Sequence, residues 1–330
     1  MKKTILLLFL IPGIISTVFS QDSSDDFKPN GKPVALIFTN FNTAFKDGGE
    51  TKKSFQITRA YLGYEYNFTP QWYAKIVMDV GDPKVGAFQR VAYLKNAYIQ
   101  YKNKGFKVSG GMISTTQFKV SEKTWGLRYI EKSYQDAYKF NSSADLGINI
   151  EYKFADFISA DFSVINGEGY KVLQNDNYVR PGVGVTVTPV KNVVARVFVD
   201  NMGDTIKQQS LATFLGYKGE KLVVGGEYNY QKNFGMDVEG RDVYGTSFYA
   251  TYQAFDKFMF FARFDDLKSK TVEGEQNPWN YNNDGQLIMA GFEYAPIKGV
   301  KIAPNYRFWG PADSSIPSTS YVYFNVELKF

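Results

Sequence analysis

The stretch YVYFNVELKF, Tyr321 to Phe330, alternates apolar and polar side chains up to an aromatic last residue. Chain ends are usually polar and frayed, so this pattern needs an explanation. Successive side chains of a strand point to opposite faces, and one face here carries Val322, Phe324, Val326, Leu328 and Phe330. Something apolar must cover that face, either the core of a soluble β-protein or the hydrocarbon of a membrane.

The same period-2 alternation, rich in Tyr, Phe, Val and Thr, recurs along the chain, whereas no segment of useful length has a helical period. About sixteen such runs are expected, which is an even number in the range of single-chain outer-membrane barrels. They lie near 33–43, 54–68, 71–82, 89–102, 105–114, 143–154, 157–167, 178–188, 192–201, 208–218, 221–232, 242–254, 257–267, 284–295, 299–309 and 319–330.

The connections between these runs alternate in length. Tight ones read TPQ, NKG, AD, PVKN, GE, FDK and PIKG, and mostly longer polar ones lie around 44–53, 83–88, 115–142, 168–177, 202–207, 233–241, 268–283 and 310–318. Short periplasmic turns and longer extracellular loops are typical of outer-membrane barrels, with both chain ends on the short-turn side. The fold class predicted is therefore all-β: a transmembrane antiparallel β-barrel in the outer membrane of a Gram-negative bacterium.

The two faces of the runs support this prediction. In 143–154 an apolar face with Leu146, Ile148 and Phe154 opposes a polar face with Asp145 and Glu151. A water-filled lumen accommodates charges in mid-strand, whereas a soluble core does not. Aromatic residues also gather on the apolar face near the short turns, as in an interfacial girdle: Tyr66, Phe68, Tyr101, Tyr152, Phe154, Tyr252, Phe292 and Tyr294. Lys95 falls on the lipid face unless a bulge near Leu94 to Asn96 shifts the register.

Residues 1–20 read as a secretory signal peptide, with Lys2 and Lys3 before an apolar run and the small residues Val18 and Ser20 before a cut at Gln21. Residues 21–32 are polar and acidic and are expected to be a flexible periplasmic leader. The barrel is expected to span 33–330, because no second long apolar run exists.

Composition excludes several kinds of function. The chain has no cysteine and no histidine, so Cys nucleophiles, His bases and His or Cys metal sites are absent. Neighbouring carboxylates such as Asp265 and Asp266 point to opposite faces of a strand, which does not suit paired acid–base work. A formal charge of +5 on 38 basic and 33 acidic residues gives no reason to expect nucleic acid as a partner. We expect neither enzymatic activity nor a cofactor.

The longest connection, 115–142, is expected to be an ordered loop that narrows the lumen. Long loops are usually functional or disordered, and the aromatic residues of this one argue against disorder. The candidate constriction residues are Trp125, Arg128, Glu131, Lys132 and Asp136. Arg128 and Lys132, at i, i+4 spacing, are expected to present positive charge to anions, unless the loop is solvated outside and its charges pair with each other.

Charged residues of both signs fall on the inner face of the other runs. Mixed charges favour weak selectivity, since a strong filter needs a ring of one sign, and several of these groups are expected to be structural ion pairs. The candidate pore-lining residues are Arg59, Lys75, Asp79, Arg196, Arg263, Asp265, Lys301 and Arg307.

Three segments carry a resemblance to a known family: FQITRAYLGYEYNFTPQWYAKIVMDV (Phe55 to Val80), WGLRYIEKSYQDAYKFNSSADLG (Trp125 to Gly147) and the terminal YFNVELKF. They resemble outer-membrane porins of the phosphate-selective porin O and P type, especially the forms found in Bacteroidetes. The resemblance implies a sixteen-stranded channel that assembles as a homotrimer. The terminal strand ending in Phe330 also resembles the signal by which barrels are recognised by the outer-membrane assembly machinery.

The function predicted is passive diffusion of small hydrophilic solutes or ions through a porin, with membrane lipid as the surrounding partner. The nearest alternative is a phosphate- or anion-selective channel. Alternatives of another class are an occluded structural or adhesive outer-membrane barrel and a secreted β-sandwich that binds a glycan through its aromatic residues.

Overall fold

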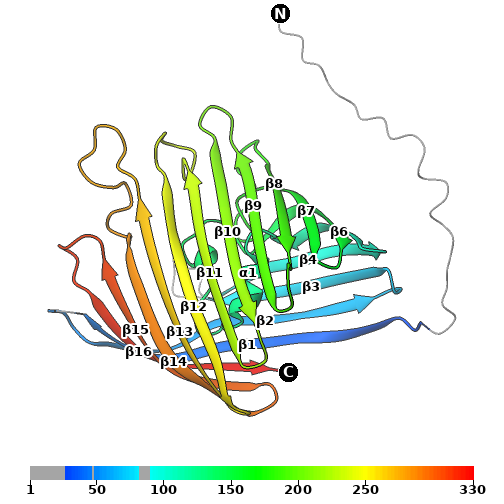
Figure 1. The fold of residues 1–330 in the computed structure, drawn as a ribbon, viewed down its shortest axis with the longest axis horizontal. Coiled ribbons are helices and arrows are strands. Elements are labelled where there is room, and N and C mark those ends of the chain that lie inside the picture. The colour runs from blue at the N-terminus through cyan, green and yellow to red at the C-terminus, as the bar shows by residue number, and fades with distance from the viewer. Residues whose placement is uncertain (1–26, 47, 82–89) are drawn as a thin grey trace, which may run out of the picture.

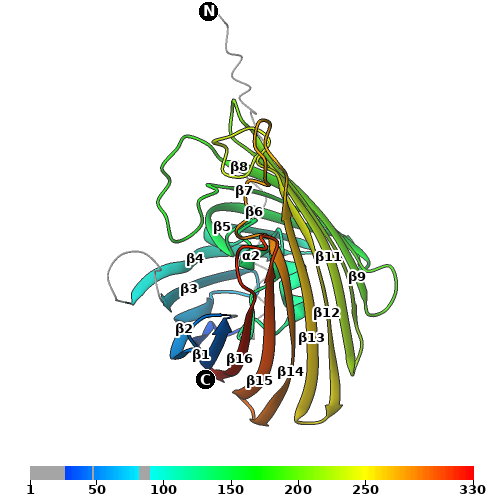
Figure 2. The same ribbon diagram turned by 90° about the vertical axis from the view of Figure 1, so that its left-hand side faces the viewer.

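Sixteen strands form one closed antiparallel sheet in the computed structural model, which describes residues 27–46, 48–81 and 90–330. Neighbouring strands follow chain order around the barrel, and β1 pairs with β16 to close it (Figures 1 and 2). The strands are β1 (Asn30–Lys46), β2 (Lys52–Asn67), β3 (Trp72–Gly81), β4 (Val91–Asn103), β5 (Phe106–Ser114), β6 (Ala144–Ala155), β7 (Ile158–Ile165), β8 (Arg180–Val187), β9 (Val193–Met202), β10 (Gln208–Lys218), β11 (Leu222–Lys232), β12 (Val243–Phe255), β13 (Phe258–Ser269), β14 (Gly285–Ile297), β15 (Val300–Pro311) and β16 (Thr319–Lys329). The predicted fold class and number of strands are confirmed.

The expected signal peptide, 1–20, lies outside the described residues, as does the first half of the expected leader, 21–26. The end of that leader differs from the expectation, because β1 begins at Asn30 and its first residues pair with the end of β2. Pairing uses backbone groups, so polar side chains do not prevent it. Lys32 also forms an ion pair with Glu65 at 3.2 Å.

The connections alternate in length as the sequence predicts. Short ones span 68–71, 104–105, 156–157, 188–192, 219–221, 256–257 and 298–299, and longer ones include 115–143, 166–179, 233–242 and 270–284. The turn between β4 and β5 shows the local cause. Lys104 and Gly105 both have positive φ, 44° and 85°, which suits a two-residue hairpin whose twist matches that of the strands.

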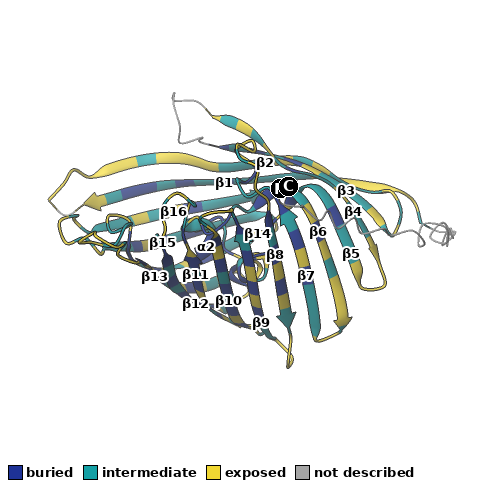
Figure 3. Ribbon diagram, turned by 90° about the horizontal axis from the view of Figure 1, so that it is seen from above, coloured by how far each residue is buried: buried dark blue, intermediate teal, exposed yellow. Residues whose placement is uncertain are grey.

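Each strand places apolar side chains outside and polar side chains inside, as β6 illustrates. Leu146, Ile148 and Phe154 are 47%, 55% and 64% exposed on the outer face, while Asp145 and Asn149 are buried on the inner face. Figure 3 shows the alternation along the other strands. So many large apolar side chains on the outside of a closed sheet require a hydrocarbon environment. A β-sandwich is excluded, because the sheet closes on itself.

Aromatic rings cluster on the outer face near the short turns, where the sequence predicts an interfacial girdle. The ring pairs are Tyr66 with Phe68, Trp72 with Tyr101, Tyr152 with Phe154, and Phe258 with Tyr294, with centroids 4.8 to 5.0 Å apart. Rings at this level contact lipid with their apolar parts and headgroups with their polar edges.

A β-bulge in β4 resolves the placement of Lys95. Val77 pairs with Asn96 and Met78 with Leu94, so Lys95 is the extra residue between them. The bulge turns its side chain away from lipid, and its ammonium donates a hydrogen bond to the Tyr61 hydroxyl at 3.2 Å. The conditional prediction of a bulge near Leu94 to Asn96 is confirmed.

The terminal strand β16 has the predicted faces. Val322, Phe324 and Phe330 are exposed on the outer side, and Asn325 is buried on the inner side. The Phe330 amide donates a hydrogen bond to the Ala35 carbonyl at 3.1 Å, so the chain end is paired with β1. Lipid is therefore what covers the apolar face of the last ten residues.

Candidate pore constriction

The connection 115–143 between β5 and β6, called the inner loop below, lies inside the barrel (Figures 1 and 2). It contains two short helices, α1 (Lys119–Trp125) and α2 (Tyr134–Ala137). Gly126 ends α1 in a left-handed conformation with φ of 69°, and its amide donates to the Glu122 carbonyl. No helix among the described residues has the length and apolar character needed to cross a membrane.

Apolar packing holds one side of the inner loop against the wall. Trp125 is 2% exposed and its ring lies 5.1 Å from that of Tyr249 and 6.4 Å from that of Phe261. Leu127 and Ile130 belong to the same buried cluster. Trp125, a candidate constriction residue, is thus an anchor beneath the loop. Burial of a side chain this large is worth several kcal/mol, roughly 3 to 5 by analogy with large-to-small core changes.

Buried arginines of the wall hold the loop backbone. The guanidinium groups of Arg196, Arg263 and Arg307 donate to the carbonyls of Thr116, Lys132 and Ile130 at 2.9, 2.5 and 2.7 Å. Each also pairs with a carboxylate, namely Asp161, Asp265 and Glu131. These candidate pore-lining residues, together with the candidate Glu131, therefore lie where wall and loop meet.

One arginine of this kind, Arg180, was absent from the candidates drawn from the sequence. It donates to the Phe140 carbonyl at 3.2 Å and pairs with Asp200 at 2.8 Å. In the sequence, Arg180 occupies one of the alternate positions of the run 178–188 that share its inner face, and this alternation could have identified it. Further side chains bond the loop from the same walls: Gln231 to the Phe140 carbonyl, Asn325 to the Tyr129 carbonyl, and Tyr249 to the Ser121 carbonyl.

The attachment of the loop is asymmetric. Its bonds to β8–β16, called the covered wall, involve charged inner side chains that are almost fully buried, such as Arg180 at 3% and Asp265 at 0%, although Lys301 near the short turns keeps 34% of its side chain exposed. On β2–β6, called the open wall, Lys75, Lys107 and Glu151 keep 24%, 27% and 27% of their side-chain surface exposed. The exposed charges thus lie near the short turns, whereas Asp79 and Asp145, farther along the open wall, are buried.

The side of the loop that faces the open wall carries a cluster of four charged residues, Glu122, Arg128, Lys132 and Asp136. Arg128 pairs with Asp136 at 2.6 Å and also with Glu122, and Lys132 lies 3.5 Å from Asp136. Arg128 also contacts the Tyr61 hydroxyl on β2, and Tyr61 belongs to the same buried cluster as Trp125 and Leu127. These contacts bring three candidates, Arg128, Lys132 and Asp136, together at one level of the barrel.

Burial and charge act in opposite directions on these groups. Burial favours the neutral form of Asp136, but Arg128 and Lys132 outweigh it and hold the pKa of that carboxyl below its usual range. Burial lowers the pKa of the Lys132 ammonium, and the nearby Arg59 and Arg128 lower it further against the attraction of Asp136. Lys132 is thus the cation of the cluster whose charge is most easily lost.

A second loop, 166–179 between β7 and β8, also reaches this level. The Tyr170 hydroxyl donates to Asp79 at 2.5 Å and accepts a hydrogen bond from Arg59 at 3.2 Å. Arg59 and Asp79 pair directly at 2.5 Å, and Tyr170, which no sequence pattern places at this level, bonds to both of these candidate pore-lining residues. Asp145 fixes the loop by accepting from the Gly167 and Gly169 amides at 2.7 and 3.2 Å.

The remaining candidates lie nearer the short-turn side. Lys75 pairs with Glu65 at 2.9 Å, and Lys301 pairs with Glu293 at 3.2 Å. Glu293 also accepts a hydrogen bond from the Tyr129 hydroxyl at 2.8 Å. Of the eight candidate pore-lining residues, Arg59, Lys75, Asp79 and Lys301 thus pair within the wall, and Tyr170 joins the first of these pairs to a second loop.

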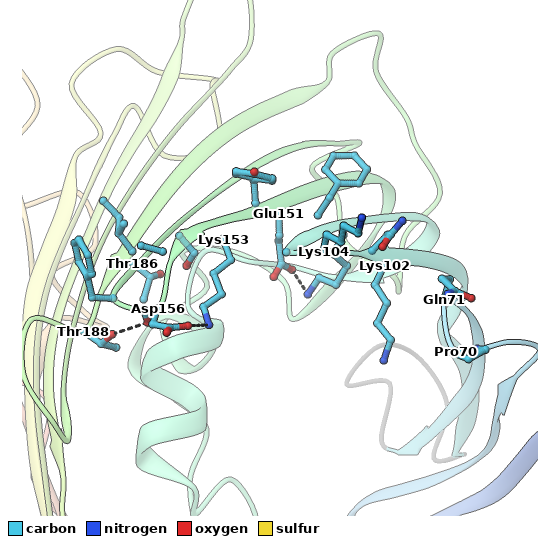
Figure 4. Close-up of a pocket in the computed structure, with 18 residues that line it drawn as sticks. Pro70, Gln71, Lys102, Lys104, Glu151, Lys153, Asp156, Thr186 and Thr188 are labelled. Carbon is cyan, nitrogen blue, oxygen red and sulfur yellow. Dashed lines mark hydrogen bonds and ion pairs between the residues drawn. The ribbon is translucent and has the colours of Figure 1, made fainter. Parts of the chain in front are cut away.

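A cavity of about 620 Å³ opens at the short-turn end of the open wall (Figure 4). Lys102, Lys104, Lys107 and Lys153 line it, with Glu151 and Asp156 as the carboxylates. Lys107 and Lys119 both bind one oxygen of Glu151, at 2.5 and 3.0 Å. Lysines outnumber carboxylates here, so the mouth has a positive potential.

Within the described ranges, no group of three or more His, Cys, Asp or Glu side chains is arranged to hold a metal ion. The charged residues are instead paired with one another, and many bond the loop backbone. Such an arrangement sorts solutes by size and charge.

Comparison with known proteins identifies the fold. No family model matches the chain, and neither does any curated protein. Among solved structures, a loop-deletion mutant of OmpT, an outer membrane protein of Vibrio cholerae, matches with a TM-score of 0.68 and 15% identity, covering 92% of this chain and 99% of that one. The anion-selective porin from Comamonas acidovorans matches with a TM-score of 0.68 and 11% identity, covering 92% and 100%.

The outer membrane channel DcaP of Acinetobacter baumannii also matches, with a TM-score of 0.67, 12% identity and coverage of 92% and 97%. At such identities the similarity establishes the fold alone. The fold, the closed sheet and the apolar exterior together define an outer-membrane β-barrel of the Gram-negative type. The inner loop gives it the interior described above.

Proposed function

We propose that this chain is an outer-membrane porin that lets small hydrophilic solutes and ions diffuse passively, with the inner loop as its constriction. The observation that carries the proposal is the way the loop is held inside the barrel. Buried arginines fix it to the covered wall, and Lys119 pairs with Glu151 on β6, while Lys75, Lys107 and Glu151 of the open wall remain partly exposed. A loop fixed in this way narrows the lumen, and the partly exposed charges support a lumen that stays open near the short turns.

The proposed route runs between the loop cluster and the open wall and ends at the cavity on the short-turn side. Selection along it depends on width and on the lining charges, and no covalent step is involved. We accordingly propose no enzymatic role. Two of the similar structures are described as an outer membrane channel and as an anion-selective porin, which agrees with this proposal.

The charges at the constriction favour a weak preference for anions. Four cations, Arg59, Lys95, Arg128 and Lys132, face three carboxylates, Asp79, Glu122 and Asp136. A net charge of one sets a modest potential, and most of these groups partly neutralise each other. General diffusion with mild anion preference is therefore our first choice.

The second candidate is a phosphate- or anion-selective channel, as the resemblance to phosphate-selective porins implies. A neighbour in structure is described as an anion-selective porin. However, the guanidinium groups of Arg196, Arg263 and Arg307 donate to loop carbonyls and pair with carboxylates. They therefore do not form a row of unpaired positive charges along the lumen. Strong selectivity for phosphate is for that reason the less favoured proposal.

We also propose that the protein assembles as a homotrimer and is inserted by the outer-membrane assembly machinery. One similar structure, OmpT of Vibrio cholerae, is described as a trimer form. Cross-linking of the protein in native membranes tests the first proposal, with a ladder that ends at three copies as the expected result. A ladder that ends at one copy contradicts it.

Conductance in a planar lipid bilayer tests the proposed function. We expect the purified protein to add stepwise conductance in KCl. Its reversal potential in a salt gradient is expected to indicate a slightly higher permeability for the anion than for the cation. A reversal potential that indicates strong anion selectivity, together with block of the chloride current by phosphate, favours the second candidate. Heat-modifiable migration on a gel confirms that the barrel is folded in the same sample.

Absence of conductance steps from a heat-modifiable sample contradicts the channel proposal and favours an occluded structural or adhesive barrel. A matched variant keeps this result interpretable. Arg241→Ala removes an exposed pair with Asp237 outside the lumen, and it is expected to conduct like the wild type.

A further inference from the structure

Lys95 occupies an unusual position among the lumenal cations. The bulge in β4 inserts it between Leu94 and Asn96, so it enters the lumen at a point where a regular strand would place it in lipid. The bulge interrupts the ladder of hydrogen bonds between β3 and β4, and it turns Lys95 inward. A wall with a purely structural role does not need an inward lysine at this point.

The partners of Lys95 are aromatic. Its ammonium donates to the Tyr61 hydroxyl at 3.2 Å and lies 4.6 Å from the centroid of that ring and 5.5 Å from that of Tyr170. Among the residues that the structure describes, no carboxylate lies within ion-pair distance of it. Arg59, Arg128 and Lys132, at the same level of the barrel, each have a carboxylate partner. An ammonium has three donors, so Lys95 keeps donor capacity for a solute.

The surroundings of Lys95 combine charge with an aromatic surface. Tyr93, opposite Asp79 in the strand register, packs edge to face against Tyr170 with centroids 6.2 Å apart. Tyr61, which is 7% exposed, holds its hydroxyl between the Lys95 ammonium and Arg128 of the loop. Lys95 therefore stands at the constriction, on the open wall, opposite the loop cluster.

We propose that the Lys95 ammonium, positioned by the Tyr61 hydroxyl, is a binding site for small monovalent carboxylates, at which such anions pause as they pass the constriction. This inference rests on the proposed channel function and adds a substrate class to it. A carboxylate has two acceptor oxygens for the two donors that the ammonium keeps beside its bond to Tyr61, and its apolar body suits the ring of Tyr93.

A multivalent oxyanion fits this site less well. Asp79 and Asp136 lie near the same level and repel additional negative charge, and Lys95 supplies a single positive charge that Asp136 already attracts from beyond ion-pair distance. The charge balance thus favours monovalent anions.

Reversal potentials in gradients of KCl and of potassium acetate test the site. We expect Lys95→Gln to lower the anion-to-cation permeability ratio by about threefold, more in acetate than in chloride, because the local anion concentration falls. Lys95→Arg keeps the charge and is expected to stay near the wild type. Lys46→Gln, at the exposed end of β1, is the matched control and is expected to change the ratio little. An unchanged ratio for Lys95→Gln in both salts overturns the proposal.

A second readout does not depend on conduction and separates the two proposals. The chain has no cysteine, so Tyr93→Cys provides a single thiol two residues from Lys95, and Lys171→Gln accompanies it because the Lys171 ammonium lies 4.9 Å from the centroid of the Tyr93 ring. We expect an anionic thiosulfonate reagent to label this thiol faster than a cationic one. Lys95→Gln is expected to reduce the ratio of the two labelling rates about fivefold. Acetate should slow the anionic reagent more than chloride does at equal ionic strength. Preference that persists without Lys95, or equal slowing by the two anions, contradicts the carboxylate site even in a barrel that does not conduct.

Discussion

The guanidinium of Arg307 on β15 donates a hydrogen bond to the carbonyl of Ile130 in the inner loop, 2.7 Å away. The same side chain pairs with Glu131, so one residue fixes both the backbone and a side chain of the loop. We predict that Arg307→Ala destabilises the barrel by about 3 kcal/mol, since it leaves buried acceptors without a donor. Urea unfolding in detergent measures this, with Arg241→Ala as the exposed control. Equal midpoints for the two variants contradict the anchoring role.

Trp125 tests the apolar half of the anchor. Trp125→Ala leaves a large void between the loop and the rings of Tyr249 and Phe261, and we expect the loop to leave the wall. Trypsin should then cleave after Arg128 or Lys132 in the folded barrel, whereas the wild type resists. Trp125→Phe keeps most of the packing and is expected to resist as well. Resistance of the alanine variant indicates that the hydrogen bonds alone hold the loop.

The loop cluster is expected to contribute to selectivity. Arg128→Ala leaves Glu122 and Asp136 without their shared partner, and Lys132→Ala removes a second positive charge. Each variant should shift the reversal potential towards cations, with the larger shift for Arg128. Unchanged selectivity in the double variant removes this loop from the filter.

The lowered pKa of Lys132 gives the channel a pH dependence. Its ammonium is charged at low pH, and the charge is lost as pH rises through a pKa that lies below the usual lysine range. Anion preference should therefore decline at alkaline pH, before ordinary lysines titrate. Lys132→Arg should remove the decline, because arginine stays protonated. A decline of the same size in the arginine variant assigns the titration to another group.

The terminal residue Phe330 is expected to act in assembly. Its side chain is 78% exposed to lipid and its amide bonds to Ala35, so the residue contributes little to the lumen. Deletion of Phe330 should reduce the amount of barrel in the outer membrane several-fold, while the molecules that do insert conduct normally. Normal insertion of the deletion variant counts against an assembly signal.

The sequence predicted the barrel because every strand repeats the same two-faced pattern, and because loop lengths sort by side. β6 illustrates this, since Leu146 and Asp145 lie on the predicted faces. Period-2 alternation is a local property and can be read without tertiary information. The bulge at Lys95 was also foreseeable, because a lysine in lipid is costly and a register shift avoids the cost.

The interior was harder to predict, since it depends on contacts between residues far apart in the chain. The alternation of faces along a strand places Arg263 and Arg307 on the inner face. Only the folded loop shows that they donate to the carbonyls of Lys132 and Ile130 instead of facing solvent. Tyr170 lies in a loop with no periodic pattern, and it reaches Asp79 from 91 residues away. Such long-range partners leave no mark in local sequence.

The most direct test of the account compares two single cysteines in this cysteine-free chain, one on each wall. Gln100→Cys lies half-buried on the inner face of β4, on the open wall, and Ala212→Cys lies 3% exposed on β10, beneath the inner loop. A charged thiosulfonate reagent is added while conductance is recorded in a bilayer. We predict that it reduces the current through Gln100→Cys channels and leaves Ala212→Cys channels unchanged. Block at Ala212 without block at Gln100 would contradict a route along the open wall.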